Sequence, residues 1–413
     1  MSRVLKVLQP QYLKKFQCIC GDCEEVCCNG WTVAIDQKTY ELYENFPDPN
    51  IRQELQKCFI RNEKAADTNS YAKLKMREDN GNCPFLNTEK MCSIQRDYGK
   101  KYLSPICTMY PRVYNIANNL LEKSLIVSCP EAARAVLLNP KLMEFEMAAE
   151  AESIPKLFSC YLFVEKEELN TKAEAYFPQI RPFVISLLQT REYQLWQRLF
   201  ILGLFAKQID KLVAANKLSE ILPLIITYLE QIQTGTVKNS FEYIPNKLDL
   251  QLKIIQLIIE RKGQTTVNQR FKECFNNALT GLNYSPELPP AELSAHYDFV
   301  YQTYYQPFMQ DHEYILENYL VNYIFNTLFP FTSDRGVFEN YLTLIVHYAM
   351  VKMLCIGMAG FYKEDFNADH VIKVIQSLTK VITHDSSFIS SLVSFLAENK
   401  LDNMAHMAVL IKN

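Results

Sequence analysis

Five of the thirteen cysteines fall within eleven residues near the start of the chain, at Cys18, Cys20, Cys23, Cys27 and Cys28. If this segment is helical from Cys20 onward, Cys20, Cys23 and Cys27 share one face, because residues three and seven apart align along a helix. An ordinary hydrophobic core has no need of five neighbouring thiols. Thiolates are ligands of zinc and of iron–sulfur clusters, so this segment indicates a metal or cluster site.

Four further cysteines stand alone, each at an expected turn or at the boundary of an expected element: Cys83, Cys92, Cys107 and Cys129. Such boundaries are natural places from which to present a metal ligand. The other four occur in helical contexts and are interpreted as small buried hydrophobic residues: Cys58, Cys160, Cys274 and Cys355.

The first histidine of the chain is His296. A zinc site of mixed cysteine and histidine ligands is therefore excluded from the cysteine-rich region, unless a distant helix supplies the imidazole. All-thiolate coordination fits either a structural zinc or an iron–sulfur cluster, in one four-ligand site with spare thiols or in two sites. The Cys-x3-Cys-x2-Cys spacing of radical enzymes that use S-adenosylmethionine is absent, because Gly30 occupies its third position.

Composition excludes several classes of protein. The 43 basic and 46 acidic residues nearly balance, so nothing marks a nucleic-acid partner. With 11 glycines in 413 residues and no Gly-x-Gly-x-x-Gly after a strand, a nucleotide-cradling loop is not indicated. The N-terminus lacks the apolar core of a secretory signal.

One apolar run, 341–362, is long enough to cross a bilayer, but it contains His347 and Lys352 and lacks the flanks of a membrane span. We interpret it as a buried helix. We therefore expect no membrane partner and a cytoplasmic location, where thiols stay reduced and cysteines serve metals rather than disulfides.

Around the cysteines the sequence predicts short elements. A strand is expected at 31–35, a helix capped by Asp36 to residue 45, a helix over 51–66, and a half-exposed strand over 71–76. Pro105 and Pro111 bracket Cys107, which favours an extended or turn backbone there. A hairpin is expected over 113–127 around Asn118-Asn119, and Pro130 begins the next helix.

Apolar residues recur at helical spacing through most of the remaining chain. The expected helices cover 192–212, 218–233, 248–261, 268–279, 291–309, 313–329, 338–359, 369–381, 386–398 and 402–411. The fold class is therefore mainly α. A small α+β cysteine-rich domain that binds the metal or cluster (1–135) precedes an all-α helical domain (136–413), with a subdivision near 284–291, where Pro286, Pro289 and Pro290 cluster.

Polar residues within apolar helices give weaker signals. A patch made of Glu317, Asn318, Tyr319, Asn322 and Tyr323 favours a buried hydrogen-bond network over a substrate or cofactor pocket. His347 on its apolar helix favours a satisfied core histidine, and Gly357 and Gly360 favour close helix packing or a helix cap. Arg112 in Tyr-Pro-Arg can bind a carboxylate, although a structural pairing is equally well supported.

Several motifs resemble the bacterial flagellin lysine-N-methylases in order and spacing. The chain opens with Gln9-Pro10-x5-Phe16-x-Cys18 and continues with Cys23-x3-Cys27-Cys28-x-Gly30-Trp31. The later motifs are Gly81-Asn-Cys-Pro-Phe-Leu86, the Cys92 segment, Cys107-x2-Tyr-Pro-Arg112, Ser128-Cys-Pro-Glu131 and Glu317-Asn-Tyr-x2-Asn-Tyr323 with Phe329-Pro330. More distantly, the cysteine set is similar to small cysteine-cluster domains described as zinc- or iron-chelating.

The resemblance implies transfer of a methyl group from S-adenosylmethionine to the ε-amine of flagellin lysines, with a cysteine-bound iron–sulfur cluster, most simply 4Fe-4S. Carried over position by position, the matching thiols are Cys18, Cys23, Cys27, Cys28, Cys83, Cys92, Cys107 and Cys129. Cys20 is an additional thiol where the family pattern has glycine.

A methyl acceptor must be a neutral amine, which calls for a desolvated tunnel, a base, or both. Glu317, Tyr319 and Tyr323 are the catalytic candidates, and Arg112 is the candidate for the carboxylate of S-adenosylmethionine. The alternative is a non-enzymatic adaptor, in which an all-cysteine zinc site folds the N-terminal region and the helices bind a partner. The lack of a recognisable S-adenosylmethionine fold favours that alternative.

Overall fold

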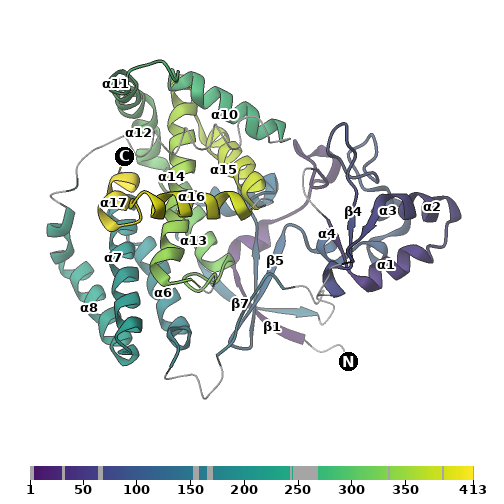
Figure 1. Cartoon of the computed structure of the whole chain (residues 1–413), viewed down its shortest axis with the longest axis horizontal. Coiled ribbons are helices and arrows are strands. Elements are labelled where there is room, and N and C mark those ends of the chain that lie inside the picture. Colours follow the sequence, from purple (N-terminus) through teal and green to yellow (C-terminus); the bar gives the residue numbers. More distant parts are fainter. Residues whose placement is uncertain are drawn as a thin grey trace.

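The computed structural model describes residues 4–29, 33–63, 68–151, 158–164, 171–241, 244, 268–333, 335–383 and 386–412. It confirms a mainly α fold: a small cysteine-rich region lies on one side of a central sheet, and a large group of helices lies on the other (Figure 1). We call residues 17–110 the cysteine lobe and the remainder the body.

The central sheet has five strands in the order β7-β1-β6-β5-β8. Their bounds are Val4–Pro10 for β1, Arg112–Ala117 for β5, Leu120–Leu125 for β6, Phe145–Ala151 for β7 and Cys160–Leu162 for β8. β5 and β6 form the expected hairpin, and Asn118 and Asn119 at its tip have φ of 47° and 66°, as a tight hairpin turn requires. β7 and β8 were not anticipated by the sequence analysis and follow residue 136.

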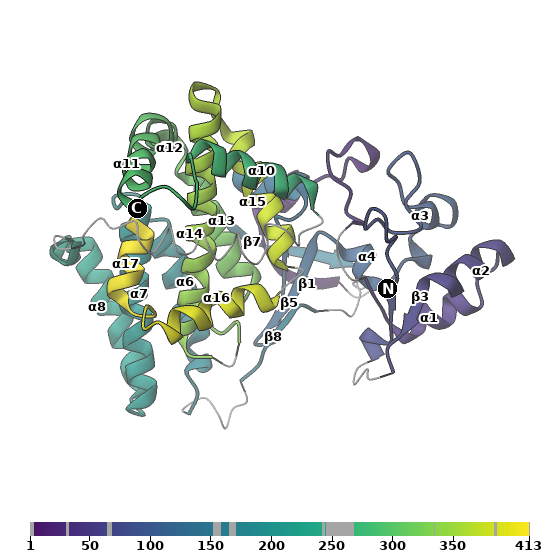
Figure 2. The ribbon, with the colours of Figure 1, turned by 45° about the horizontal axis from the view of Figure 1, so that its top comes forward.

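In the sequence, the cysteine lobe is inserted between β1 and β5, two strands of this sheet. β1 runs parallel to β6 on one side, with Leu8 opposite Glu122, and β5 runs antiparallel to β6 on the other, with Arg112 opposite Leu125. The end of β1 and the start of β5 therefore lie at the same end of the sheet, on either side of β6. Figure 2 shows the lobe projecting from this end, away from the helices.

Within the lobe the elements are short. A three-stranded sheet, ordered β2-β4-β3, is made of Ala34–Ile35, Ala72–Leu74 and Phe59–Arg61. Helices α1 (Gln37–Glu44), α2 (Pro49–Cys58), α3 (Ser93–Tyr98) and α4 (Pro105–Met109) pack around it. The Asp36 carboxylate accepts a hydrogen bond from the Thr39 amide at 3.1 Å, which confirms the predicted cap of α1.

Three local predictions in this region are wrong. The cysteine segment is not a helix from Cys20 onward, because only Cys20–Asp22 forms a 3-10 turn and Cys23 is extended. The helix expected over 51–66 ends at Cys58, where the chain turns into β3. Cys107 is helical, because Pro105 sits at the first helical position, where proline's missing N–H costs nothing. Residues 31 and 32 of the strand expected at 31–35 lie outside the described part.

The body contains long helices. Their bounds are α5 Pro130–Leu137, α6 Phe177–Leu188, α7 Leu195–Ala214, α8 Ile221–Thr234, α10 Gln269–Gly281, α11 Pro290–Val300, α12 Gln306–His312, α13 Tyr314–Asn326, α14 Val337–Tyr362, α15 Ala368–Thr383, α16 Ser386–Glu398 and α17 Met404–Lys412. A π-helical turn, Tyr301–Tyr305, joins α11 to α12 where one helix was expected. The helix predicted over 248–261 lies outside the described residues.

Among the described residues, two large hydrophobic cores and a small third cluster around Phe177 hold the protein together. The smaller of the two cores belongs to the lobe and includes Val33, Phe46, Leu55 and Phe85. The larger one joins helices on both sides of 284–291 and extends into the chain before residue 135, through Leu125 and other residues. The sheet and the helices of the body thus share one core.

Helix α14 runs through the centre of the body, as a buried helix should. It is long and apolar enough to cross a membrane, but 89% of its most apolar window is buried inside the protein. Its glycines allow close packing on α10: a Cβ at Gly357 would stand 2.5 Å from the Ala278 carbonyl oxygen, and one at Gly281 would stand 2.0 Å from the Gly357 oxygen. The close-packing interpretation of Gly357 and Gly360 is therefore confirmed.

Candidate functional site

Nine cysteines line a single cavity of about 500 Å³ at the junction of lobe and body: Cys18, Cys20, Cys23, Cys27, Cys28, Cys83, Cys92, Cys107 and Cys129. They are all eight of the cysteines singled out by the resemblance together with the additional Cys20. They come from five separate stretches of chain that the fold brings together. The walls between them are largely apolar, with Phe16, Val33, Ile35 and Phe85 among them.

One group of thiols is defined by their mutual electrostatic effects. The Sγ atoms of Cys27 and Cys28 are 3.5 Å apart. Burial is the main cause that raises the pKa of Cys83 to about 12, and the charges of Cys92 and Cys107 contribute to this rise. Burial also raises the pKa of Cys107 to about 11, with Cys92 and Cys27 adding to the effect. Cys27, Cys28, Cys83, Cys92 and Cys107 are therefore electrostatic neighbours, and we call them the inner group.

A second group is defined in the same way. The Sγ atoms of Cys18 and Cys20 are 4.0 Å apart. Burial raises the pKa of Cys129 to about 12, and the nearby charges of Cys23 and Cys18 contribute in the same direction. We call Cys18, Cys20, Cys23 and Cys129 the outer group. It combines three cysteines of the lobe with Cys129, which caps α5 of the body.

Three of these cysteines lie at the start of a helix. Cys92 is the N-cap of α3 and Cys129 that of α5, while Cys107 lies in the first turn of α4 beside the capping side chain of Ser104. Backbone amides that point at a thiol stabilise its thiolate form. For Cys92 and Cys129 this effect opposes the larger one of burial, which favours the neutral thiol, whereas for Cys107 the hydrogen bond with the Ser104 side chain opposes burial.

The donor set fits a thiophilic metal or an iron–sulfur cluster, since the described lining of the cavity presents nine thiols and no histidine. The sulfurs face one space without forming a finished coordination shell. Across the described residues, no three histidine, cysteine, aspartate or glutamate side chains are arranged so that they can hold a metal ion as they stand.

Lys380 of α15 is a site residue that the sequence analysis missed. Its side chain is 4% exposed and lines the cysteine cavity. Its Nζ donates to the Glu25 carboxylate at 2.8 Å and to the Val26 carbonyl at 3.0 Å. The hydrogen bond from Cys28 is the main cause that lowers the pKa of Cys27 to about 7, and the positive charge of Lys380 acts in the same direction despite burial.

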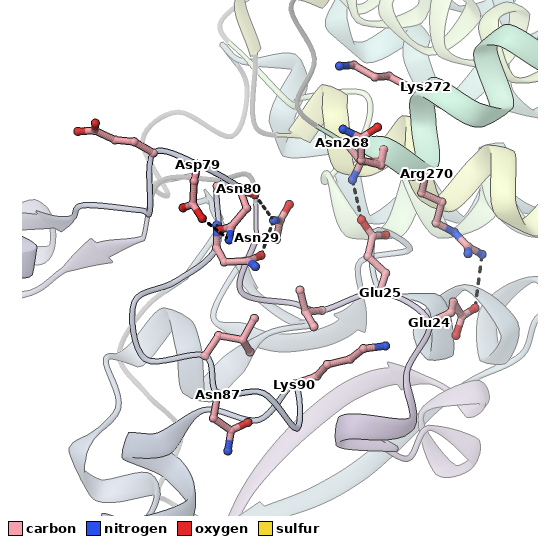
Figure 3. Close-up of a pocket in the computed structure, with 16 residues that line it drawn as sticks. Glu24, Glu25, Asn29, Asp79, Asn80, Asn87, Lys90, Asn268, Arg270 and Lys272 are labelled. Carbon is pink, nitrogen blue, oxygen red and sulfur yellow. Dashed lines mark hydrogen bonds and ion pairs between the residues drawn. The ribbon is translucent and has the colours of Figure 1, made fainter.

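Helices of the body hold the cysteine segment in place through its two glutamates. Besides Lys380, Gln376 of α15 and Asn268 at the start of α10 donate to Glu25. Glu24 pairs with Arg134 of α5. It also pairs with Arg270 of α10 at 3.4 Å (Figure 3). No periodicity links these residues in sequence, since Glu25 and Lys380 are 355 positions apart, so only the fold identifies the contact.

Arg112 begins β5, next to cavity-lining Pro111. Its guanidinium carbon lies 5.1 Å from the centre of the Phe16 ring, a stacking contact with another wall residue of the cysteine cavity. Arg112 is not itself a lining residue. It contacts the cavity wall through Phe16, and it forms no ion pair with any described carboxylate.

The three catalytic candidates on α13 do not reach the cysteine cavity. Glu317 is 1% exposed and binds Arg191 at 2.8 Å and Arg198 at 2.6 Å. The Tyr319 hydroxyl lies 3.5 Å from Nδ1 of His347, and the Tyr323 ring packs 5.2 Å from the His347 ring. These side chains lie in the interior of the body.

The neighbouring amides complete the network expected of this patch. Asn318 donates to the carbonyls of Leu137 and Asn139, and Asn322 donates to that of Leu125. The Tyr12 hydroxyl in turn donates to Asn322. The patch therefore forms a buried hydrogen-bond network that ties α13 to the sheet and to α5.

Comparison with known proteins connects this arrangement to a family. The family model described as the FliB lysine N-methylase C-terminal domain matches residues 181–410, which is more than half of the chain. The lysine-N-methylase of Salmonella typhimurium strain LT2 is 27% identical over 236 residues, covering 56% of this chain and 55% of that protein. The lysine-N-methylase of Salmonella choleraesuis strain SC-B67 gives the same identity and coverage.

A third relative is the flagellar biosynthetic protein FliU of Salmonella muenchen, which is 30% identical over 139 residues, covering 34% of this chain and 81% of that protein. No solved structure matches the chain. The alignments span about half the length of the curated lysine-N-methylases. The match of the helical body to the family model is nonetheless sufficient for assignment, and the chain belongs to the FliB lysine N-methylase family.

Proposed function

We propose that the protein is a protein-lysine N-methyltransferase that modifies lysine side chains of flagellin, with S-adenosylmethionine as the methyl donor. The observation that carries this proposal is membership of the family, in which two relatives are named lysine-N-methylase and a third is named a flagellar biosynthetic protein. The cavity beside the matched helices is the place we propose for the chemistry.

We further propose that the cavity holds an iron–sulfur cluster, with four ligands drawn from the inner group. These five thiols are mutual neighbours, and Cys27 is the thiol most easily ionised, which supports it as the first ligand. The outer group would then supply spare thiols or a second site. Such a cluster can provide electrons or act as a scaffold for the surrounding chain.

The walls of the cavity favour the reactive form of a substrate lysine. An ε-ammonium that enters an apolar space loses hydration, and desolvation lowers its pKa from about 10.4 toward neutrality. Lys380 is already paired with Glu25, so desolvation by the apolar walls is the effect that favours a neutral amine. Burial can therefore present a neutral amine without a dedicated base.

Arg112 is the residue we propose for the carboxylate of S-adenosylmethionine. Its guanidinium lies over the Phe16 ring and has no carboxylate partner among the described residues, so its donors are available for a planar anion. Glu317, by contrast, is occupied by two arginines, which supports a structural role for this carboxylate.

We propose that the protein acts in the cytoplasm, where its thiols would stay reduced. The test compares flagellin from cells with and without the gene by mass spectrometry. The expected result is that flagellin lysines are heavier by one or more methyl groups only when the gene is present. Unchanged masses would reject the assignment.

Metal analysis of anaerobically purified protein separates the cofactor proposals. A brown protein with iron and acid-labile sulfide supports the cluster. A colourless protein with stoichiometric zinc supports instead the adaptor, in which thiolate-bound zinc only folds the lobe.

A further inference from the structure

A second hollow, of about 600 Å³, opens next to the cysteine cavity (Figure 3). The cysteine segment at 24–29 forms its floor, the lobe contributes the loop at 78–82 and the stretch at 86–90, and the first turn of α10 forms the opposite side. Glu25, Val26, Leu86 and Lys90 line both hollows, so the two spaces share a wall. A molecule bound in this cleft would lie one side chain away from the thiols.

The lining of the cleft is polar and carries several asparagines: Asn29, Asn80, Asn82, Asn87 and Asn268. An amide side chain offers a donor and an acceptor in the geometry of a peptide group. The amide nitrogens of Asn29, Asn80 and Asn268 already donate within the protein, so the remaining polar groups of the lining are those that can bind a ligand. Among the described residues the lining includes no aromatic side chain, whereas a nucleotide base is commonly held by stacking on one. This polar lining therefore fits a polypeptide segment better than a nucleoside.

Charges of opposite sign stand on its two sides. Glu24 and Glu25 are already paired with Arg134 and Lys380. Asp79 on the lobe loop and Lys272 on α10 form no ion pair with any other residue in the described ranges, so both charges are available to a ligand. A peptide segment with residues of both signs fits this arrangement.

We propose that the cleft binds an extended segment of the polypeptide substrate, and that the shared wall at Val26 and Lys90 is where a substrate lysine passes into the cysteine cavity. This inference rests on the proposed methyltransferase function and specifies where its protein substrate docks. The segment lies across the junction of lobe and body, so both parts of the molecule contribute to its recognition.

Site-specific cross-linking tests the position directly. A photoreactive p-benzoylphenylalanine replaces exposed Asp79 in the full-length protein loaded with its metal, and a matched control replaces Glu54, an exposed residue of α2 in the same lobe. Flagellin is the probe. Cross-linking from position 79 but not from position 54, at a peptide that contains a methylated lysine, is the expected result.

Kinetics provide a second readout. Lys272→Glu is expected to raise the KM for flagellin about two- to fivefold, which corresponds to loss of one exposed charge contact, and to leave kcat and the KM for S-adenosylmethionine unchanged. The matched control is Lys217→Glu, the same charge reversal at an exposed residue after α7, and it should alter none of these constants.

The outcomes separate this inference from the function on which it rests. Methylation by the unsubstituted protein, with no cross-link at position 79 and an unchanged KM in Lys272→Glu, overturns the docking cleft alone. A specific cross-link at position 79 without methylation overturns the methyltransferase proposal and leaves the cleft as a polypeptide site. Absence of both overturns both.

Discussion

The lobe and the body of this protein are stabilised in different ways. The body buries α14 and its neighbours in one extensive apolar core. The lobe has only a small cluster around Phe46 and Leu55, and the face it turns to the body is lined with thiols. Small units with little apolar area to bury usually depend on a metal or a disulfide. The difference indicates that the body can fold by hydrophobic burial alone, whereas the stability of the lobe would depend on the cofactor that we propose for its thiols.

The largest expected effect concerns the inner thiols. Replacing Cys83 and Cys107 together by serine should abolish metal binding and leave the lobe sensitive to proteolysis, because metal binding of this kind supplies about 10–16 kcal/mol of folding free energy. The body should keep its helical circular dichroism. Metal content by mass spectrometry and limited proteolysis measure the two effects.

Cys160→Ser, a change of the same kind at a cysteine of β8 outside the cavity, is the matched control and should retain full metal content. If the doubly substituted protein binds metal normally and its lobe resists protease, the dependence of the lobe on its thiols is refuted.

The next effect lies in the body, at its buried ion pairs. Glu317→Ala leaves Arg198, whose side chain is 2% exposed, without one of its carboxylate partners. Arg198 keeps its ion pair with Glu313, so the loss is that of a buried charge-assisted hydrogen bond, about 1.5–3 kcal/mol, and urea denaturation should show a loss of that order. Glu339→Ala breaks the exposed pair with Arg335 and should cost less than about 1 kcal/mol. Equal losses in both variants would contradict the assignment of Glu317 to the framework of the body.

The loss of stability in acid should also distinguish the body from the lobe, because every histidine of the chain belongs to the body. Burial lowers the pKa of His347 to about 4. As pH falls below about 6.5, the unfolded state takes up a proton at this histidine while the folded state does not until about pH 4. Stability from this group is therefore complete above pH 6.5 and declines below it, by about 2 kcal/mol at pH 5.

His347→Leu should remove this component. Its stability, measured by denaturant titration at pH 7.5 and pH 5, should fall less on acidification than that of the unsubstituted protein. Parallel pH profiles for the two proteins would show that His347 does not contribute.

The smallest expected effect is confined to the lobe. Asp36→Ala removes the cap of α1 and should cost about 1 kcal/mol, seen as faster hydrogen exchange of the α1 amides with no change in α14. Lys38→Ala, at an exposed position on the same helix, should leave exchange nearly unchanged. If α14 responds to Asp36→Ala as strongly as α1 does, lobe and body unfold as one unit and the comparison fails.

Local chemistry made some features predictable. The Asn118-Asn119 hairpin, the Asp36 cap and the Pro130 helix start each depend on a few adjacent residues. The gathering of the cysteines was predictable for another reason: thiols of this number and placement have few uses other than a shared ligand.

Long-range contacts were not predictable in this way. β7 reads Phe-Glu-Met-Ala-Ala-Glu-Ala, composed largely of good helix formers, and it is a strand because it pairs along the whole of β1. Lys380 looked like an ordinary helix residue, and its contact with Glu25 exists only in the folded chain. The residues that distant helices contribute to the candidate site could therefore not be predicted from the sequence.

The two attachment points of the lobe flank a single strand, which has a consequence for the origin of the molecule. Neighbouring strands are spaced about 4.8 Å apart, so the chain leaves β1 and returns at β5 across a gap of roughly 10 Å. A gap of that size can be bridged by a few residues, so an ancestral form without the insertion could have kept the five-stranded sheet and its helices intact. The thiol-bearing module can then be regarded as a graft, acquired or exchanged as one piece on an older helical scaffold.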